Sequence, residues 1–86
     1  MPEYLIELYV SRTEAGVVTE RCQTARVAAE ELTRRGTAVR LHRSMFVPDE
    51  ETWFVLFEAE SPEAVRDATR LAGLPCDRVS SVISQI

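Results

Sequence analysis

The sequence predicts an α+β fold in which a four-stranded antiparallel sheet carries two helices on one face. Three observations predict it: alternating apolar residues near both ends of the chain, two helical stripes between them, and a hairpin pattern in the middle. The resulting order of strand, helix, strand, strand, helix, strand is the ferredoxin-like βαββαβ arrangement. Right-handed crossovers then place both helices on the same side of the sheet. We expect residues 1–86 to form a single domain of this kind.

The middle of the chain, residues 46–75, is the clearest part of this pattern. A polar cluster that begins at Pro48 predicts a turn, and six β-branched, aromatic or aliphatic residues then predict a central strand over 52–59. A shift of one residue in the turn would exchange the faces of this strand. Either Trp53, Val55 and Phe57 or Phe54 and Leu56 therefore face the helices.

The second helix has start and stop signals at both ends. Ser61 can accept a hydrogen bond from the free amides of the first turn, and Pro62 suits the first helical position. Gly73 can adopt the left-handed conformation that ends a helix, and Pro75 prevents its continuation. The apolar stripe of this helix comprises Val65, Ala68, Leu71 and Ala72.

The first half of the chain predicts a strand over 3–10 and then a helix that ends at residues 34–36. The strand alternates, with one face formed by Tyr4, Ile6, Leu8 and Val10. Thr19 is a reasonable N-cap for the helix, although Thr13 could begin it earlier. Its buried stripe comprises Val18, Cys22, Ala25, Ala29 and Leu32.

Two further strands complete the sheet. The first spans 37–47, where alternation sets Val39, Leu41, Met45 and Val47 on one side, with an interruption at Arg43. The other side comprises Ala38, Arg40, His42, Ser44 and Phe46. The last strand spans 78–86.

Composition excludes several classes of partner. The net charge of −4 argues against binding to nucleic acid or to an anionic membrane. There is no apolar run of membrane-spanning length and no secretory signal, so we expect a cytoplasmic protein.

Cys22 and Cys76 are too few for a disulfide framework. A bridge between them is geometrically conceivable, but reduction in the cytoplasm favours free thiols.

The sheet face that the helices leave uncovered predicts a homodimer. It would carry Leu5, Glu7, Tyr9, Arg40, His42, Phe46 and part of the aromatic third strand. Such a face is too apolar for a small solvated monomer. Packing of sheet against sheet in a dimeric α/β barrel would cover it, with any pocket between the two sheets or between sheet and helices.

Polar residues on this face are the candidate site. Glu7, between Leu5 and Tyr9, could act as a general base or a metal ligand, or it could pair with an arginine such as Arg40 or Arg43. His42 is the single histidine, with an acid-base, metal-binding or merely hydrogen-bonding role. We expect a ligand site formed by Glu7, Tyr9, His42, Arg43 and Glu58. A metal ion would use His42 and Glu7, and it would recruit further carboxylates or ligands from both subunits.

The chain resembles a small bacterial family of ferredoxin-like proteins, described as a domain of unknown function, that includes an actinobacterial nickel-binding protein. The resemblance is carried by the opening residues 4–7, by the segments 43–44, 46–52, 57–59 and 61–65, and by 72–75 with 78–79. It implies a dimer and points to nickel. In the nickel-binding branch a histidine commonly precedes the serine that corresponds to Ser44, whereas Arg43 holds this position here. A guanidinium removes a ligand and repels a divalent cation.

Three functions are compatible with these residues. The first is a homodimer that binds a small ligand or a divalent metal ion such as nickel and has no assigned catalysis. The second is a cofactor-independent enzyme of the isomerase, cyclase or monooxygenase type, with a pocket on the sheet of a dimeric α/β barrel, an idea that rests on fold analogy. The third is a stress-related interaction module. A deep apolar cavity that contains Glu7 or His42 would favour the enzyme.

Overall fold

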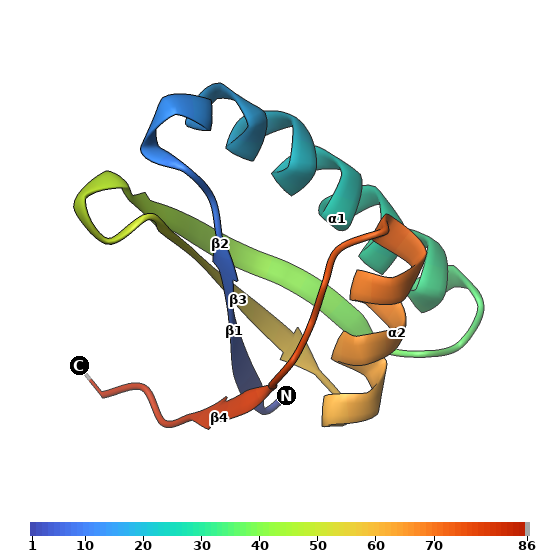
Figure 1. The fold of residues 1–86 in the computed structure, drawn as a ribbon. Coiled ribbons are helices and arrows are strands. Elements are labelled where there is room, and N and C mark those ends of the chain that lie inside the picture. Colours follow the sequence, from blue (N-terminus) through green and yellow to red (C-terminus); the bar gives the residue numbers. More distant parts are fainter. Residues whose placement is uncertain (86) are drawn as a thin grey trace.

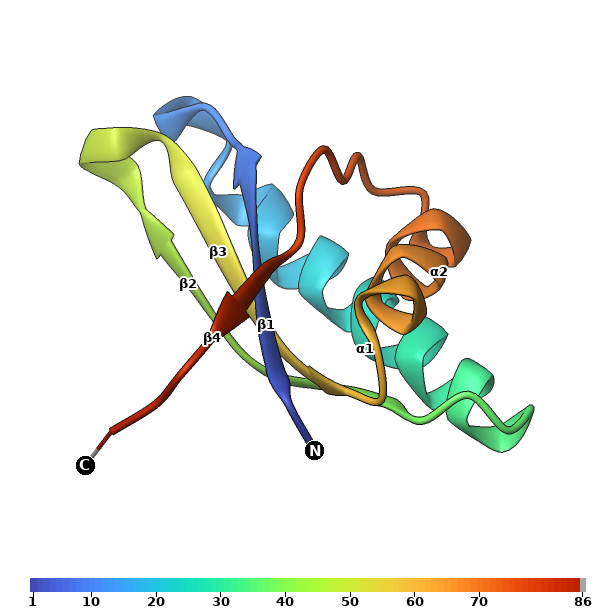
Figure 2. The same ribbon diagram turned by 90° about the horizontal axis from the view of Figure 1, so that it is seen from below.

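The computed structural model describes residues 1–85 and shows one antiparallel sheet with two α-helices packed on it (Figure 1). The strands lie in the order β2-β3-β1-β4. The elements are β1 (Glu3–Tyr9), η1 (Arg12–Glu14), α1 (Gly16–Arg34), β2 (Val39–Val47), η2 (Pro48–Glu50), β3 (Thr52–Ala59), α2 (Pro62–Ala72) and β4 (Ser80–Val82). Both α-helices lie on the same face, and the opposite face is bare (Figure 2). The predicted α+β arrangement is confirmed, and it fits a ferredoxin-like fold.

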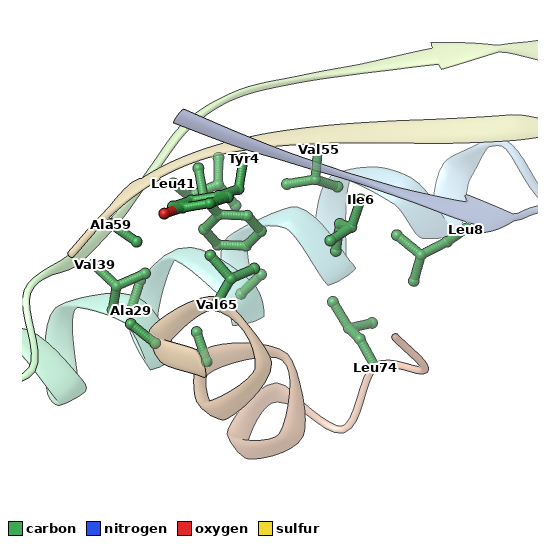
Figure 3. Close-up of a cluster of buried hydrophobic side chains, with 14 of the residues drawn as sticks. Tyr4, Ile6, Leu8, Ala29, Val39, Leu41, Val55, Ala59, Val65 and Leu74 are labelled. Atoms are coloured by element: carbon green, nitrogen blue, oxygen red, sulfur yellow. The ribbon is translucent and has the colours of Figure 1, made fainter. Parts of the chain in front are cut away.

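The core fills the space between the sheet and the two helices (Figure 3). The predicted inner face of β1 is confirmed, since Tyr4, Ile6, Leu8 and Val10 are all buried. The open question about β3 is also answered. Its core face is Trp53, Val55, Phe57 and Ala59, each with an exposed fraction of 0%. Small residues of α1, among them Ala25 and Ala29, let that helix approach the sheet closely.

A β-bulge at His42 divides β2 into two parts. Leu41 pairs with Phe57 and Arg43 pairs with Leu56, so β2 advances by two residues while β3 advances by one. The inserted residue exchanges the faces of the strand. Phe46 therefore packs against the core.

The bulge makes part of the predicted pattern of β2 wrong. Val39 and Leu41 are buried as expected, whereas Met45 is exposed and shares the outer face of the sheet with its partner Phe54. Phe46 does not belong to the uncovered face on which the sequence placed it. The bulge explains why the apolar alternation in the sequence is interrupted at Arg43.

Strand β2 lies at one edge of the sheet, and side chains of α1 form hydrogen bonds with the backbone groups along its free edge. The Thr33 hydroxyl donates to the Val39 carbonyl at 2.7 Å and accepts from the Val39 amide at 3.2 Å. Farther along, Arg26 Nη1 donates to the Leu41 carbonyl at 3.3 Å. These backbone groups have no neighbouring strand, so the helix satisfies them instead.

The ends of α2 follow the sequence signals closely. Ser61 Oγ accepts from the Ala64 amide at 3.2 Å, and Gly73 ends the helix with a φ of 73°. One residue of its predicted stripe is wrong, because Leu71 is 48% exposed while Thr69 is buried. The Thr69 hydroxyl donates to the Arg66 carbonyl at 2.9 Å, which lets a polar residue occupy this buried position.

The start of α1 was predicted less well. The helix begins at Gly16 after Ala15, which supplies no side-chain cap, so neither Thr13 nor Thr19 is its N-cap. The capping hydroxyl lies earlier, where Ser11 Oγ accepts from the Thr13 amide at 3.3 Å and starts η1.

Strand β4 is shorter than the predicted strand over 78–86. Val82 pairs with Glu3, the first residue of β1, and the preceding Pro2 has no amide hydrogen to continue the ladder. Ile83 is accordingly 89% exposed. Ile86, the last residue of the predicted strand, lies outside the described residues.

The two faces of β3 differ in what they contribute to stability, and a matched pair of substitutions tests this. Phe57→Leu leaves a void in a fully buried position and should lower the free energy of unfolding by about 1–2 kcal/mol. Phe54→Leu changes the outer face and should cost less than about 0.5 kcal/mol in dilute protein. Urea unfolding measures both, and equal costs would contradict this assignment of the faces.

Candidate functional site

The bulge presents His42 at the edge of the uncovered face, beside Glu58 of β3. The imidazole is 43% exposed, and its Nδ1 lies 3.1 Å from Glu58 Oε1. Arg40 Nη2 also contacts this carboxylate oxygen. Two basic side chains of β2 thus share one carboxylate of the neighbouring strand, and we call these three residues the Arg40–His42–Glu58 cluster.

Electrostatics within this cluster favour the ionised carboxylate. The hydrogen bond from Arg40 lowers the pKa of Glu58, and the positive charge of Arg40 and the contact with His42 act in the same direction. Glu58 is therefore a hydrogen-bond acceptor at neutral pH. Because the Nδ1 side of the ring is turned toward Glu58, Nε2 is the ring nitrogen that remains for a ligand.

A groove of about 380 Å³ adjoins His42 between β2 and α1. Its lining residues are Arg26, Glu30, Arg40, Leu41 and His42. Four of these five side chains are polar or charged, so the groove is not the deep apolar cavity that would favour the enzyme hypothesis. Its walls suit a small polar or charged ligand.

Glu7 lies in the middle of β1, where it pairs in register with Phe54. Its carboxylate is solvent-exposed, with Oε2 3.7 Å from Arg78 Nη2. Its cross-strand neighbour Phe54 gives it the partly apolar surroundings that the sequence predicted. The predicted contact with an arginine is also present, although the partner is Arg78 and not Arg40 or Arg43. Arg78 approaches Glu7 because the chain passes it on the way into β4.

The other two candidate residues lie apart from each other. The Tyr9 hydroxyl is 3.4 Å from Glu51 Oε2 at the hairpin end of the sheet, far along the strands from His42 and Glu58. Arg43 follows the bulge and shares the outer face with Leu56. Of the five predicted ligand-binding residues, the structure brings only His42 and Glu58 into contact.

Between these polar groups, the uncovered face carries a continuous apolar strip. It comprises Leu5, Met45, Val47, Phe54, Leu56 and Val82, which we call the apolar strip. Met45 is 46% exposed, and the remaining members are partly exposed. The expected apolar character of this face is present, although Met45 and Val47 take the place predicted for Phe46.

Within residues 1–85, no group of three or more His, Cys, Asp or Glu side chains is arranged to hold a metal ion. Both cysteines are free thiols, and Cys22 Sγ accepts a hydrogen bond from Ser44 Oγ at 3.5 Å. In the same part of the chain, neither α-helix combines the length and apolarity needed to cross a bilayer.

Sequence reasoning missed the two arginines that hold the candidate carboxylates. Arg40 contacts Glu58 because the two residues are paired across β2 and β3. Arg78 reaches Glu7 from the segment before β4. The first contact follows from the hairpin register, which the sequence left open, whereas the second depends on a loop path that no local pattern encodes.

Comparison with known proteins places most of the chain in one family. The model of the family described as "Nickel responsive protein SCO4226-like" matches residues 4–82. No curated protein and no solved structure matches the chain. The family resemblance drawn from the sequence is confirmed.

Removal of Arg40 tests the electrostatics of the cluster. In Arg40→Met we expect the pKa of Glu58 to rise towards its ordinary value, as followed by carbon-detected NMR titration of the carboxylates. Because the folded-state pKa is lowered, Glu58 stabilises the fold above its unfolded pKa, and this contribution is lost as pH falls through the lowered value. Arg40→Met should therefore be less sensitive to acid in this range.

Glu31 is the internal control for this titration. Its pKa is lowered by hydrogen bonding and charge from Arg34 and, to a lesser degree, from Arg35. It should titrate identically in the parent and in Arg40→Met. An unchanged pKa at Glu58 would show that Arg40 does not hold this carboxylate in solution.

Proposed function

Because the chain belongs to the SCO4226-like family of nickel responsive proteins, we propose that it is a cytoplasmic homodimer that binds a small ligand, foremost a divalent cation such as nickel, beside the uncovered sheet face. The observation that carries this proposal is the pairing of His42 with Glu58. Metal-binding histidines commonly donate their second ring N–H to a carboxylate, which fixes the orientation of the imidazole. His42 is the ligand in this proposal, and Glu58 positions it.

A single subunit supplies only some of the ligands that such a metal site needs. Nickel accepts imidazole and carboxylate ligands, and several donors are needed for firm binding. The described residues of one chain offer one oriented imidazole and no cluster of three donors. The remaining ligands would come from the second subunit, with Glu7 as the candidate carboxylate. Arg40 and Arg43 add positive charge nearby, so we expect weaker affinity than in a site with histidine in place of Arg43.

The homodimer is supported by the apolar strip. One face of the sheet is covered by α1 and α2, and the other leaves large side chains such as Phe54 and Leu56 partly exposed. In a chain of 86 residues the core is small, so burial of a second apolar surface adds substantially to stability. Packing of two strips against each other would complete the dimeric α/β barrel expected from the sequence.

Isothermal titration calorimetry with nickel, cobalt and zinc tests the metal site. His42→Ala should abolish the binding heat, and Glu58→Gln should weaken affinity by about tenfold or more because the imidazole loses its orienting carboxylate. At a protein concentration that keeps the proposed dimer intact, Arg43→His should tighten binding, because it replaces a repelling charge with a ligand. Arg34→His, on the exposed end of α1, is the control and should leave affinity unchanged. No heat above buffer in either the parent or Arg43→His would rule out the metal proposal.

A further inference from the structure

We propose that the two subunits pack their uncovered faces with strands roughly aligned, so that the basic edge of each sheet lies against the acidic edge of the other. The basic edge comprises Arg40, His42 and Arg43 on the edge strand β2. We use the term acidic edge for the opposite end of the charge pattern on this face, Glu3 and Glu7 on β1, which lies one strand in from β4. The inference rests on the proposed function, because it requires the homodimer. It goes further by fixing the orientation of the partner, which gives a geometric reason for Glu7 of one subunit to lie near the His42 site of the other.

Strand order separates the two kinds of charge on this face. Strand β2 forms one edge, β3 follows, and β1 lies beyond β3. The basic residues of β2 and the carboxylates of β1 therefore lie on opposite sides of the apolar residues Phe54 and Leu56 of β3. Across the strands, the face is basic on β2, mainly apolar on β3, and acidic on β1. Glu58, the one carboxylate on the outer face of β3, already pairs with Arg40 and His42.

The pairing register places these charges at similar heights along the strands. Arg40 and Glu3 both align with Glu58, at one end of the face. Arg43 aligns with Leu56, and Glu7 aligns with the next outward-facing residue, Phe54. A rotation that exchanges the two edges without a large shift along the strands brings these groups together.

Two-fold symmetry then selects among face-to-face arrangements. Sheets that pack in an aligned manner keep their strands within about 30° of each other. A two-fold axis parallel to the strands sets β2 of one subunit above the β1 and β4 side of the other, so that Arg43 faces the partner's Glu7. An axis across the strands would stack β2 on β2 and bring the basic edges together. Opposed charges favour the first arrangement, and repulsion disfavours the second.

The existing contacts of these side chains leave them available for such pairing. Within residues 1–85, Arg43 makes no ion pair. In the same part of the chain, the ion pair of Glu7 is the long contact of 3.7 Å to Arg78, and the side chains of Glu7 and Arg78 are 48% and 77% exposed. In the aligned dimer, Glu7 would lie between Arg78 of its own chain and the partner's Arg43. A symmetric interface repeats each of these pairs, so any effect of a substitution counts twice.

This arrangement also supplies what the His42 site lacks. The imidazole lies next to Arg43 at the basic edge, and the described residues of its own chain add no second and third metal donor. A carboxylate of the facing acidic edge would reach the same seam. The site would then be shared between subunits, and ligand binding would depend on dimerisation.

Reversal of charge on each side tests the orientation. We would measure the dimer dissociation constant by sedimentation equilibrium at low salt for the parent, Glu7→Arg, Arg43→Glu and the double variant. Each single reversal should raise the dissociation constant by about tenfold or more, since it sets like charges together twice. The double variant restores opposite charges and should return to within about threefold of the parent. Glu20→Arg, on the exposed side of α1, is the control and should behave as the parent.

The outcomes separate this inference from the proposal on which it rests. If the parent is a dimer and the double variant is no tighter than the weaker single variant, the orientation is wrong while the homodimer stands. Single reversals without effect would overturn it equally. A monomeric parent at micromolar concentration overturns both. Should a reversal prevent folding, Glu7→Gln and Arg43→Gln replace it, each with an expected loss of about threefold.

Discussion

One inserted residue in β2 determines which side chains of this strand face the core and which lie on the uncovered face of the sheet. Strand β2 buries Val39 and Leu41 near α2 and the end of α1, yet it also packs the partly buried Phe46 against the core near the hairpin. Side chains of a regular strand alternate between its two faces, so residues 39 and 41 would share one face and residue 46 would lie on the other. The bulge at His42 resolves the conflict and at the same time displays an imidazole, a guanidinium and Met45 on the outer face. Core packing and the candidate site thus have the same origin.

The division of the sheet into a covered and an uncovered face gives the second level of organisation. Helices α1 and α2 together protect the inner sides of all the longer strands, and the outer sides are left with the apolar strip and two charged edges. A monomer of this size gains little stability from a single core. The outer face is therefore the natural place for association, and the charges around it are suited to specifying how a partner is oriented.

Much of the fold was readable from the sequence, because its signals are local. The alternation in β1, the Ser61 cap, Pro62 and the Gly73 stop each act within a few residues, and the structure confirms them. The faces of β2 were not readable past residue 42, since a bulge depends on pairing with another strand. The same limit applies to the site. Sequence reasoning selected His42 and Glu58, but it missed Arg40 and Arg78 because their contacts depend on register and on a loop path.

The hydrogen bonds from α1 to β2 have a consequence for solubility. The outer edge of β2 is a long strand border of the kind on which another chain can add as an extra strand and begin aggregation. Thr33 and Arg26 occupy backbone groups of Val39 and Leu41, and the irregular geometry at His42 interrupts the remaining border. This protection comes from a helix and therefore lasts only while that helix stays docked. Local detachment of α1 would uncover a template for intermolecular sheet growth before the rest of the domain unfolds.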